Sequence, residues 1–221
     1  MKQFSSFDIL GPVMIGPSSS HTAGAARIGN IARKIYGGKI RSVTFYLHGS
    51  FAETYKGHGT DRALLAGLLG MDPSDDRLKS SKDIARDKGL DFKFVPTVIE
   101  GAHPNTVMIE MDGECGKMKV TGTSVGGGNI VITKIDDFNL EFNGDYPTLI
   151  TSYTDKPGVV AKVSKILNEY NINIAFMRVF RNQKGERATM IIEMDRALSS
   201  QAMDEIKKLP GMSQVMMIDP V

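Results

Sequence analysis

The last third of the chain alternates between strand and helix patterns in an order that permits few folds. Apolar residues at Val159, Val163 and Ile166 recur at helical spacing, whereas the flanking segments alternate with the period of a strand. The expected elements are a strand at 146–153, a helix from 159 that closes at 171, strands at 172–181 and 187–195, a helix at 199–209 and a strand at 215–218. This order predicts a ferredoxin-like fold, with both helices on one face of a four-stranded antiparallel sheet.

Two segments of this region carry a more specific signal. Y-T-D-K-P-G-V-V-A-K-V at 153–163 and N-I-N-I-A-F-M at 171–177 resemble the ACT domain, a family of small regulatory modules. The resemblance implies a βαββαβ fold, side-by-side pairing of two copies and binding of an amino acid where they pair. Its candidate effector-binding residues are Asp155, Pro157, Gly158, Asn171 and Asn173. A domain that serves only assembly is an open alternative, because a fold does not determine function.

Asp155 is also expected to cap the first helix of this domain, with Pro157 in its first turn. The preceding residues 138–145 are expected to be a linker between this domain, 146–221, and a first domain, 1–137.

The first domain opens with an unusual run, G-P-S-S-S-H-T-A-G at 16–24, directly before a helical pattern through Ile28, Ile35 and Tyr36. A helix N-terminus presents unpaired N–H groups and a partial positive charge, so added hydroxyls and an imidazole favour binding of a small anion. A simple helix cap is the alternative, and it needs only one serine.

Two other segments of the first domain lack the apolar periodicity of a core. One contains H-G-S and K-G-H-G-T-D within 48–61, where a strand ends and a helix begins. The other is T-G-T-S-V-G-G-G-N at 121–129, a glycine-rich loop whose amides can approach an anion. Together the three segments supply hydroxyls, imidazoles, a lysine and amides, as a site for a small carboxylated substrate requires.

The rest of the first domain mixes helices and strands. Strands are expected at 39–47, 91–95, 106–111, 117–121 and 130–135, and helices at 62–69 and 73–88. With the C-terminal domain, the chain is predicted to be an α+β protein.

Composition excludes several classes of protein. The 27 Lys and Arg against 25 Asp and Glu give a net charge of +2 without a basic block, so neither nucleic acid nor a membrane surface is an expected partner. M-K-Q-F-S-S-F-D at the start has no apolar signal core, which predicts a cytoplasmic protein. The single cysteine, Cys115, is expected to be a structural thiol, and no metal site is expected in this chain.

The three motifs of the first domain, in this order, resemble the β subunit of the iron–sulfur L-serine dehydratases (L-serine ammonia-lyases), followed by an ACT domain. The first domain also resembles the allosteric substrate-binding domain of some phosphoglycerate dehydrogenases. The second resemblance supplies the alternative function, a regulatory amino-acid-binding subunit without catalytic residues of its own.

The first resemblance implies that L-serine loses water and that the product enamine hydrolyses to pyruvate and ammonia. It also implies a [4Fe–4S] cluster, which needs three or four thiolates, so the ligands are expected on a separate, cysteine-bearing α chain. His21, His58 and His48 are the candidate catalytic residues, because imidazole titrates near neutral pH. The candidate substrate-binding residues are Ser18, Ser19, Ser20, Thr22, Lys56, Gly126, Gly127, Gly128 and Asn129. The choice of base among the histidines, the ACT effector, activity on threonine and the number of αβ units stay open.

Overall fold

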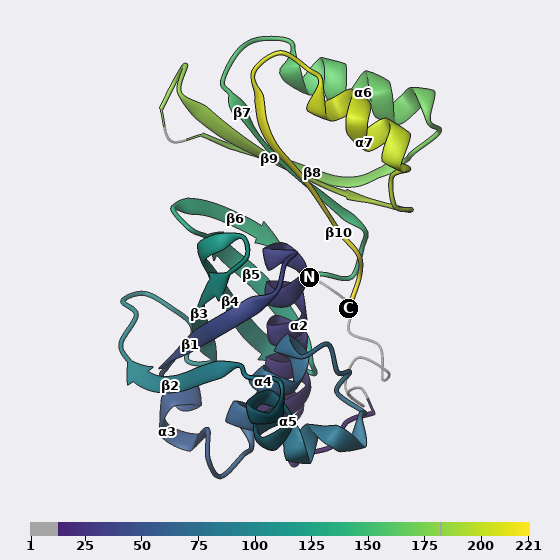
Figure 1. Ribbon diagram of the computed structural model, residues 1–221. Coiled ribbons are helices and arrows are strands. Elements are labelled where there is room, and N and C mark those ends of the chain that lie inside the picture. The colour runs from purple at the N-terminus through teal and green to yellow at the C-terminus, as the bar shows by residue number, and fades with distance from the viewer. Residues whose placement is uncertain (1–12, 182) are drawn as a thin grey trace. The chain divides into compact units, whose positions relative to one another are not determined.

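The computed structural model describes residues 13–181 and 183–221. The chain divides into two compact units, the first ending at Asp137 and the second running from Phe138 to Pro220 (Figure 1). The amino-terminal segment from which we argued a cytoplasmic location, and Asn182 in the second hairpin, lie outside the described residues.

A six-stranded mixed sheet has the strand order β2-β1-β3-β4-β5-β6. β1 and β2 are parallel, and the pairs β1–β3, β3–β4 and β4–β5 are antiparallel. The strands are β1 (Ile40–His48), β2 (Asp91–Thr97), β3 (Thr106–Gly113), β4 (Gly116–Gly126), β5 (Asn129–Ile135) and β6 (Phe138–Phe142).

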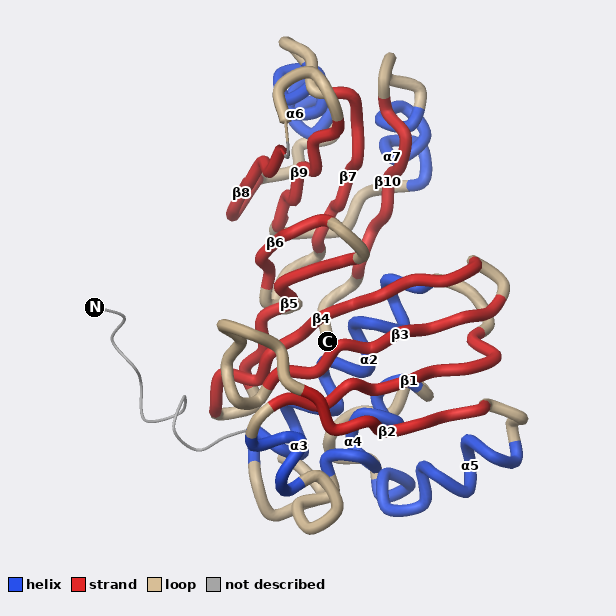
Figure 2. The backbone as a smooth tube through the Cα atoms, turned by 90° about the vertical axis from the view of Figure 1, so that its left-hand side faces the viewer, coloured by secondary structure: helices blue, strands red, loops and turns tan. Residues whose placement is uncertain are grey.

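Helices cover one face of this sheet (Figure 2). They are the π-helix η1 (Ser19–Gly24), α2 (Ala25–Tyr36), α3 (Ser50–Thr54), α4 (Thr60–Leu68), the 3₁₀ turn η2 (Asp76–Ser80) and α5 (Ser81–Asp87). The apolar face of α2 is fully buried at Ile28 and Ile31, and α4 packs against α2 through Gly67. A Cβ at Gly67 would overlap the carbonyl oxygen of Ala26, so the two helices approach at backbone distance.

The second unit contains a four-stranded antiparallel sheet with the order β10-β7-β9-β8. Its elements are β7 (Thr148–Thr154), α6 (Val159–Glu169), β8 (Ile174–Arg181), β9 (Arg187–Met194), α7 (Ser200–Lys207) and β10 (Met212–Ile218). Both helices lie on one face of the sheet, over a core that includes Leu149, Val163 and Met190 (Figure 1). The predicted α+β class and the βαββαβ fold are confirmed.

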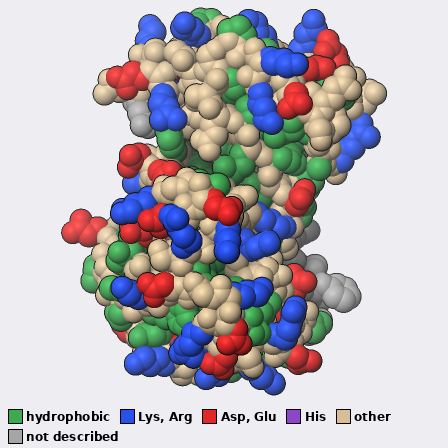
Figure 3. Space-filling view, in the orientation of Figure 1, with side chains coloured by type: hydrophobic (Ala, Val, Ile, Leu, Met, Phe, Trp, Pro, Cys, Tyr) green, Lys and Arg blue, Asp and Glu red, His purple; other side chains and the backbone are tan. Residues whose placement is uncertain are grey.

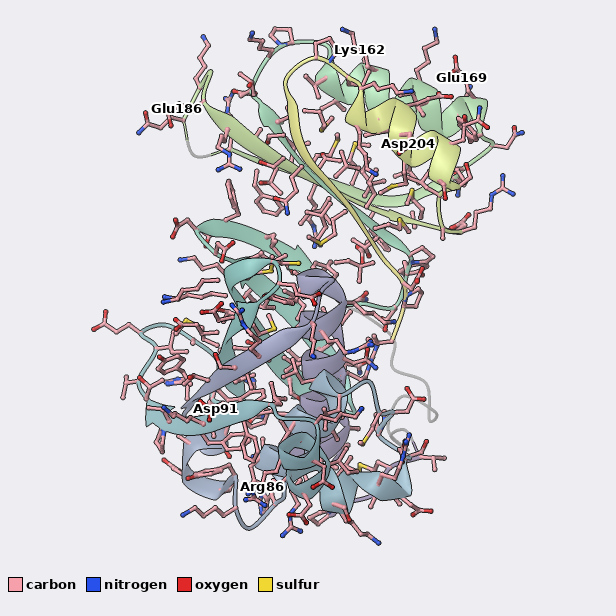
Figure 4. The ribbon with its side chains drawn as sticks, in the orientation of Figure 1. Arg86, Asp91, Lys162, Glu169, Glu186 and Asp204 are labelled. Carbon is pink, nitrogen blue, oxygen red and sulfur yellow. The ribbon has the colours of Figure 1, made fainter. Side chains whose placement is uncertain are left out.

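Charged side chains lie on the outer surfaces of the elements. Lys162 and Glu169 on α6 and Asp204 on α7 point away from the sheet (Figure 4). Acidic and basic side chains alternate over the visible face without a block of one sign (Figure 3). Within the described ranges, every helix is too short or too polar to span a bilayer.

Several local predictions were wrong. The expected helix at 73–88 is the 3₁₀ turn η2 followed by the short helix α5, and the expected loop at 121–129 belongs to strand β4 as far as Gly126. The expected linker, 138–145, contains strand β6, in which Leu140 and Phe142 are buried, so its alternating pattern is that of a short strand. Asp155 does not cap α6, whose N-cap is Gly158, and instead accepts from the N–H of Gly185 at 3.2 Å. Cys115 is exposed in the turn between β3 and β4, because a two-residue turn leaves its side chain uncovered.

Candidate active site

The serine-rich run forms a turn of π-helix, η1, that leads directly into α2. Ser18 is its N-cap, and its hydroxyl accepts from the backbone N–H of His21 at 3.3 Å. η1 lies against β4, because Gly24 leaves room for the side chain of Ser124 where a Cβ would overlap it. π-Helical turns are rare and occur frequently at functional sites. The predicted helix start at the serine-rich run is therefore confirmed, and its first turn is π-helical.

His21 is held on both ring nitrogens. Its Nδ1 lies 3.3 Å from the hydroxyl of Ser18, and its Nε2 lies 3.0 Å from the hydroxyl of Ser50 at the start of α3. The ring of Phe51 meets the imidazole edge to face, with centroids 5.3 Å apart. Only 9% of His21 is exposed. These contacts fix the orientation of the ring.

His58 is the exposed neighbour of this buried imidazole. The two rings meet edge to face, with centroids 4.8 Å apart and planes at 88°. Burial lowers the pKa of His21 below its ordinary value, the positive charge of His58 lowers this pKa further, and a hydrogen bond to the backbone of Ser50 opposes both effects. The pair therefore consists of a buried imidazole that favours its neutral form and an exposed one.

A pocket of about 200 Å³ opens beside His58. It is lined by Ile15, Gly16, Pro17, Thr22, Lys56, Gly57, His58, Gly59, Arg62, Leu78 and Lys79. Three of these side chains are cationic, and no acidic side chain is among these lining residues. Thr22 is 1% exposed, and its hydroxyl has no hydrogen-bond partner among the described residues. The pocket joins Thr22, Lys56 and His58, as the sequence predicted, and its charge suits an anionic group.

The remaining predicted residues lie elsewhere around η1. Ser19 and Ser20 are half-buried within the turn itself. Gly126, Gly127, Gly128 and Asn129 form the tight hairpin between β4 and β5 and do not line the pocket. Positive φ at Gly127 (61°) and Gly128 (84°) explains why glycine occupies this two-residue turn. This hairpin helps to hold η1 and α2 in place, because the Arg27 side chain donates a hydrogen bond to the carbonyl of Gly128 at 3.0 Å.

His48 has a partner that differs from those of the other two histidines. Its Nδ1 accepts from the backbone N–H of Ile99 at 3.1 Å, at the start of the loop that joins β2 to β3. In the same loop, the carbonyl of Pro104 accepts a hydrogen bond from the backbone N–H of Phe51. His48 thus supports the segment behind Ser50, and among the described residues its hydrogen bond joins it to Ile99, whereas His21 and His58 contact each other.

Three residues of the site were not assigned from the sequence. Arg62 directly follows the K-G-H-G-T-D motif, so its position next to His58 was a usable signal. Ser50 lies in the H-G-S motif, but its contact with His21 spans 29 residues along the chain. Lys79 comes from η2, and nothing in the local sequence indicates that it reaches the pocket.

The candidate effector residues of the second unit separate into two groups. Asp155, Pro157 and Gly158 precede α6, whereas Asn171 and Asn173 follow it. Because α6 has 11 residues, roughly 16 Å of helix separates the two groups. Asn173 is bound to Asp195 at 2.8 Å, and Asn171 adopts the left-handed conformation (φ 53°) after the helix. A single copy of the domain does not bring these residues together.

The residues of this chain do not fit an iron–sulfur cluster. Such clusters are held by three or four cysteine thiolates, and the chain has one cysteine, exposed in a hairpin turn. In the described part of the chain, no group of three or more His, Cys, Asp or Glu side chains is arranged to hold a metal ion.

Comparison with known proteins identifies the family. The model of the serine dehydratase beta chain matches residues 5–91, and that of the ACT domain matches residues 148–211. The chain is 46% identical to the probable L-serine dehydratase beta chain of Bacillus subtilis, over 97% of this chain and 98% of that one. The chain belongs to the L-serine dehydratase beta-chain family.

Two further relatives define the relationship. The L-serine dehydratase beta chain of Peptoniphilus asaccharolyticus is 42% identical over 90% of each chain. The D-3-phosphoglycerate dehydrogenase of Bacillus subtilis is 28% identical over 88% of this chain, which spans only 37% of that enzyme. As an L-serine dehydratase beta chain, this protein is a subunit of a lyase, and its C-terminal unit is an ACT domain.

Proposed function

We propose that this beta chain supplies the proton-transfer and carboxylate-binding groups of an L-serine dehydratase, together with an α chain that holds a [4Fe–4S] cluster. The observation that supports this proposal most is the pairing of buried His21 with exposed His58 beside a cationic pocket. L-Serine has an anionic carboxylate and a weakly acidic Cα–H, so its elimination requires both a cationic anchor and a base.

Each part of the site has a distinct role in this proposal. Lys56, Arg62 and Lys79 attract the substrate carboxylate, and the Thr22 hydroxyl at the pocket wall can donate to it. His58 is the base or acid, because it is exposed at the pocket whereas His21 is buried and favours its neutral form. Ser18, Ser19 and Ser20 build the turn that holds His21 in place.

The assignment of the cluster to a second chain follows from the chemistry of its ligands. One exposed thiol cannot hold a cluster that needs three or four, so the α chain must provide the cysteines. The ACT domain has an edge strand, β8, and we propose that it pairs two copies of the chain and binds an amino acid between them. That pairing would bring the two groups of candidate effector residues together from different copies.

The alternative function is a regulatory amino-acid-binding subunit. The cationic pocket favours it, because binding alone needs no base. The His21–His58 pair favours the catalytic function, because two imidazoles in contact add a capacity for proton transfer that binding does not need.

Reconstitution tests the division between the chains. The chain and a cysteine-bearing α chain are purified together without oxygen, and iron content and pyruvate formation from L-serine are measured for each chain and for the complex. We expect activity only in the complex, and Cys115→Ser should leave both iron content and activity unchanged. A large loss of iron in Cys115→Ser would show that this chain provides a ligand and would overturn the assignment.

A further inference from the structure

Ser50 occupies a position that the fold defines tightly. It begins α3 immediately after Gly49, whose φ of 56° and ψ of −127° turn the chain sharply at the end of β1. A Cβ at Gly49 would lie 2.7 Å from the carbonyl oxygen of Pro104, so only glycine fits there. This turn brings the Ser50 hydroxyl to within 3.0 Å of the Nε2 of His21.

The contacts of His21 determine where a neutral imidazole carries its proton. The Ser18 hydroxyl accepts from the backbone N–H of His21, which leaves its own hydrogen for the nearby Nδ1. The ring proton then lies on Nε2, which donates to the Ser50 hydroxyl. With the Ser18 hydroxyl as donor to Nδ1, the contact with Ser50 favours the Nε2–H tautomer of a neutral His21.

We propose that Ser50 is a positioning residue of the active site, which fixes His21 as the Nε2–H tautomer and thereby holds the ring that His58 meets edge to face. The consequence for catalysis rests on the proton-transfer role proposed for His58. A ring that changed tautomer or rotated would alter the orientation of His58, because the two centroids are 4.8 Å apart.

Electrostatics adds a reason for holding His21 neutral. His58 is the titratable group whose charge acts on His21, while Ser18, Ser50 and Phe51 face it as uncharged neighbours. An imidazolium at His21 would place a second positive charge beside that of His58, which is why the charge of His58 lowers the pKa of His21.

The test compares three variants of the full chain. Ser50→Ala removes the hydroxyl, and Ser50→Thr keeps it. Thr54→Val is the matched control, because the Thr54 hydroxyl donates to the backbone carbonyl of Ser50 at 2.7 Å and is not among the contacts of His21. The ¹⁵N chemical shifts of the His21 ring report its tautomer without any need for activity. The kcat of the reconstituted enzyme is measured across pH in parallel.

We expect the Nε2–H tautomer in the unmodified chain and in the Thr and Val variants, and a mixture of tautomers in Ser50→Ala. We also expect kcat of Ser50→Ala to fall about tenfold, the lower end of the loss seen when the partners that orient metal-bound imidazoles are removed, and its pH profile to shift. Unchanged ¹⁵N shifts in Ser50→Ala would overturn the proposal, whatever the role of His58. A changed tautomer with unchanged kcat and pH profile would equally overturn it. If the Ala variant does not fold, Ser50→Cys, a weaker acceptor of similar size, gives the same comparison.

Discussion

His21 and His58 meet edge to face with their ring centroids 4.8 Å apart, and one is buried whereas the other is exposed. The same imidazole chemistry is therefore placed in two environments, in which burial favours the neutral form of His21. Environments that separate two titratable groups in this way are typical of acid–base sites.

The lowered pKa of His21 predicts how stability depends on pH. As pH falls from the ordinary value of 6.5 towards the lower value in the folded state, the unfolded chain binds a proton that the folded chain does not. The free energy of unfolding therefore decreases through this window. Urea denaturation at about pH 7.5 and about pH 5.5 should show a smaller decrease for His21→Gln than for the unmodified chain. His103→Gln, at an exposed histidine, is the control, and an equal decrease in all three proteins would contradict the prediction.

The pocket predicts an effect on substrate binding from residues that the sequence did not single out. Arg62→Ala or Lys79→Ala should raise the KM for L-serine by roughly tenfold or more, because a hydrogen bond to a charged group contributes about 1.5–3 kcal/mol. The kcat should change little, because a contact with the carboxylate stabilises the bound substrate and the transition state equally. Lys88→Ala, at an exposed lysine after α5 that does not line the pocket, should leave KM unchanged. Equal KM values for all three variants would place the carboxylate elsewhere.

The contact between η1 and β4 predicts a specific steric effect. Gly24→Ala should destabilise the chain by about 1–3 kcal/mol, because its new Cβ would overlap the Ser124 side chain. Adding Ser124→Gly should recover part of this loss, which a double-mutant cycle by urea denaturation would measure. Gly57→Ala, which meets only a carbonyl oxygen at 3.7 Å, is the neutral control. Additive effects of the two substitutions would mean that the two residues do not share this contact.

The edge strand β8 predicts how the chain self-associates. Phe176 is 52% exposed on this strand, and an exposed apolar edge is suited to pairing with another copy. Phe176→Glu should lower the mass measured by sedimentation equilibrium, whereas Gln201→Glu on α7 should not. Identical masses for both variants and the unmodified chain would contradict pairing through β8.

The sequence predicted the second unit well, because its helices and strands have distinct periods and glycine or proline marks their ends. It placed His21 at a helix start and His58 in the same site. It could not show that Ser50 completes this site, since that contact depends on a turn at Gly49 and on packing across 29 residues. The strand at Phe138–Phe142 was missed because five residues give too short a pattern to distinguish from a linker.

The most direct test of the catalytic role is the turnover of the reconstituted enzyme with His58 replaced. At saturating L-serine, His58→Gln should lower kcat by about 100-fold or more, because general acid–base catalysis contributes at least that factor. His103→Gln, which changes an exposed histidine away from the pocket lining, should retain full kcat. An unchanged kcat in His58→Gln with only a raised KM would contradict proton transfer by this chain and would favour the regulatory binding subunit.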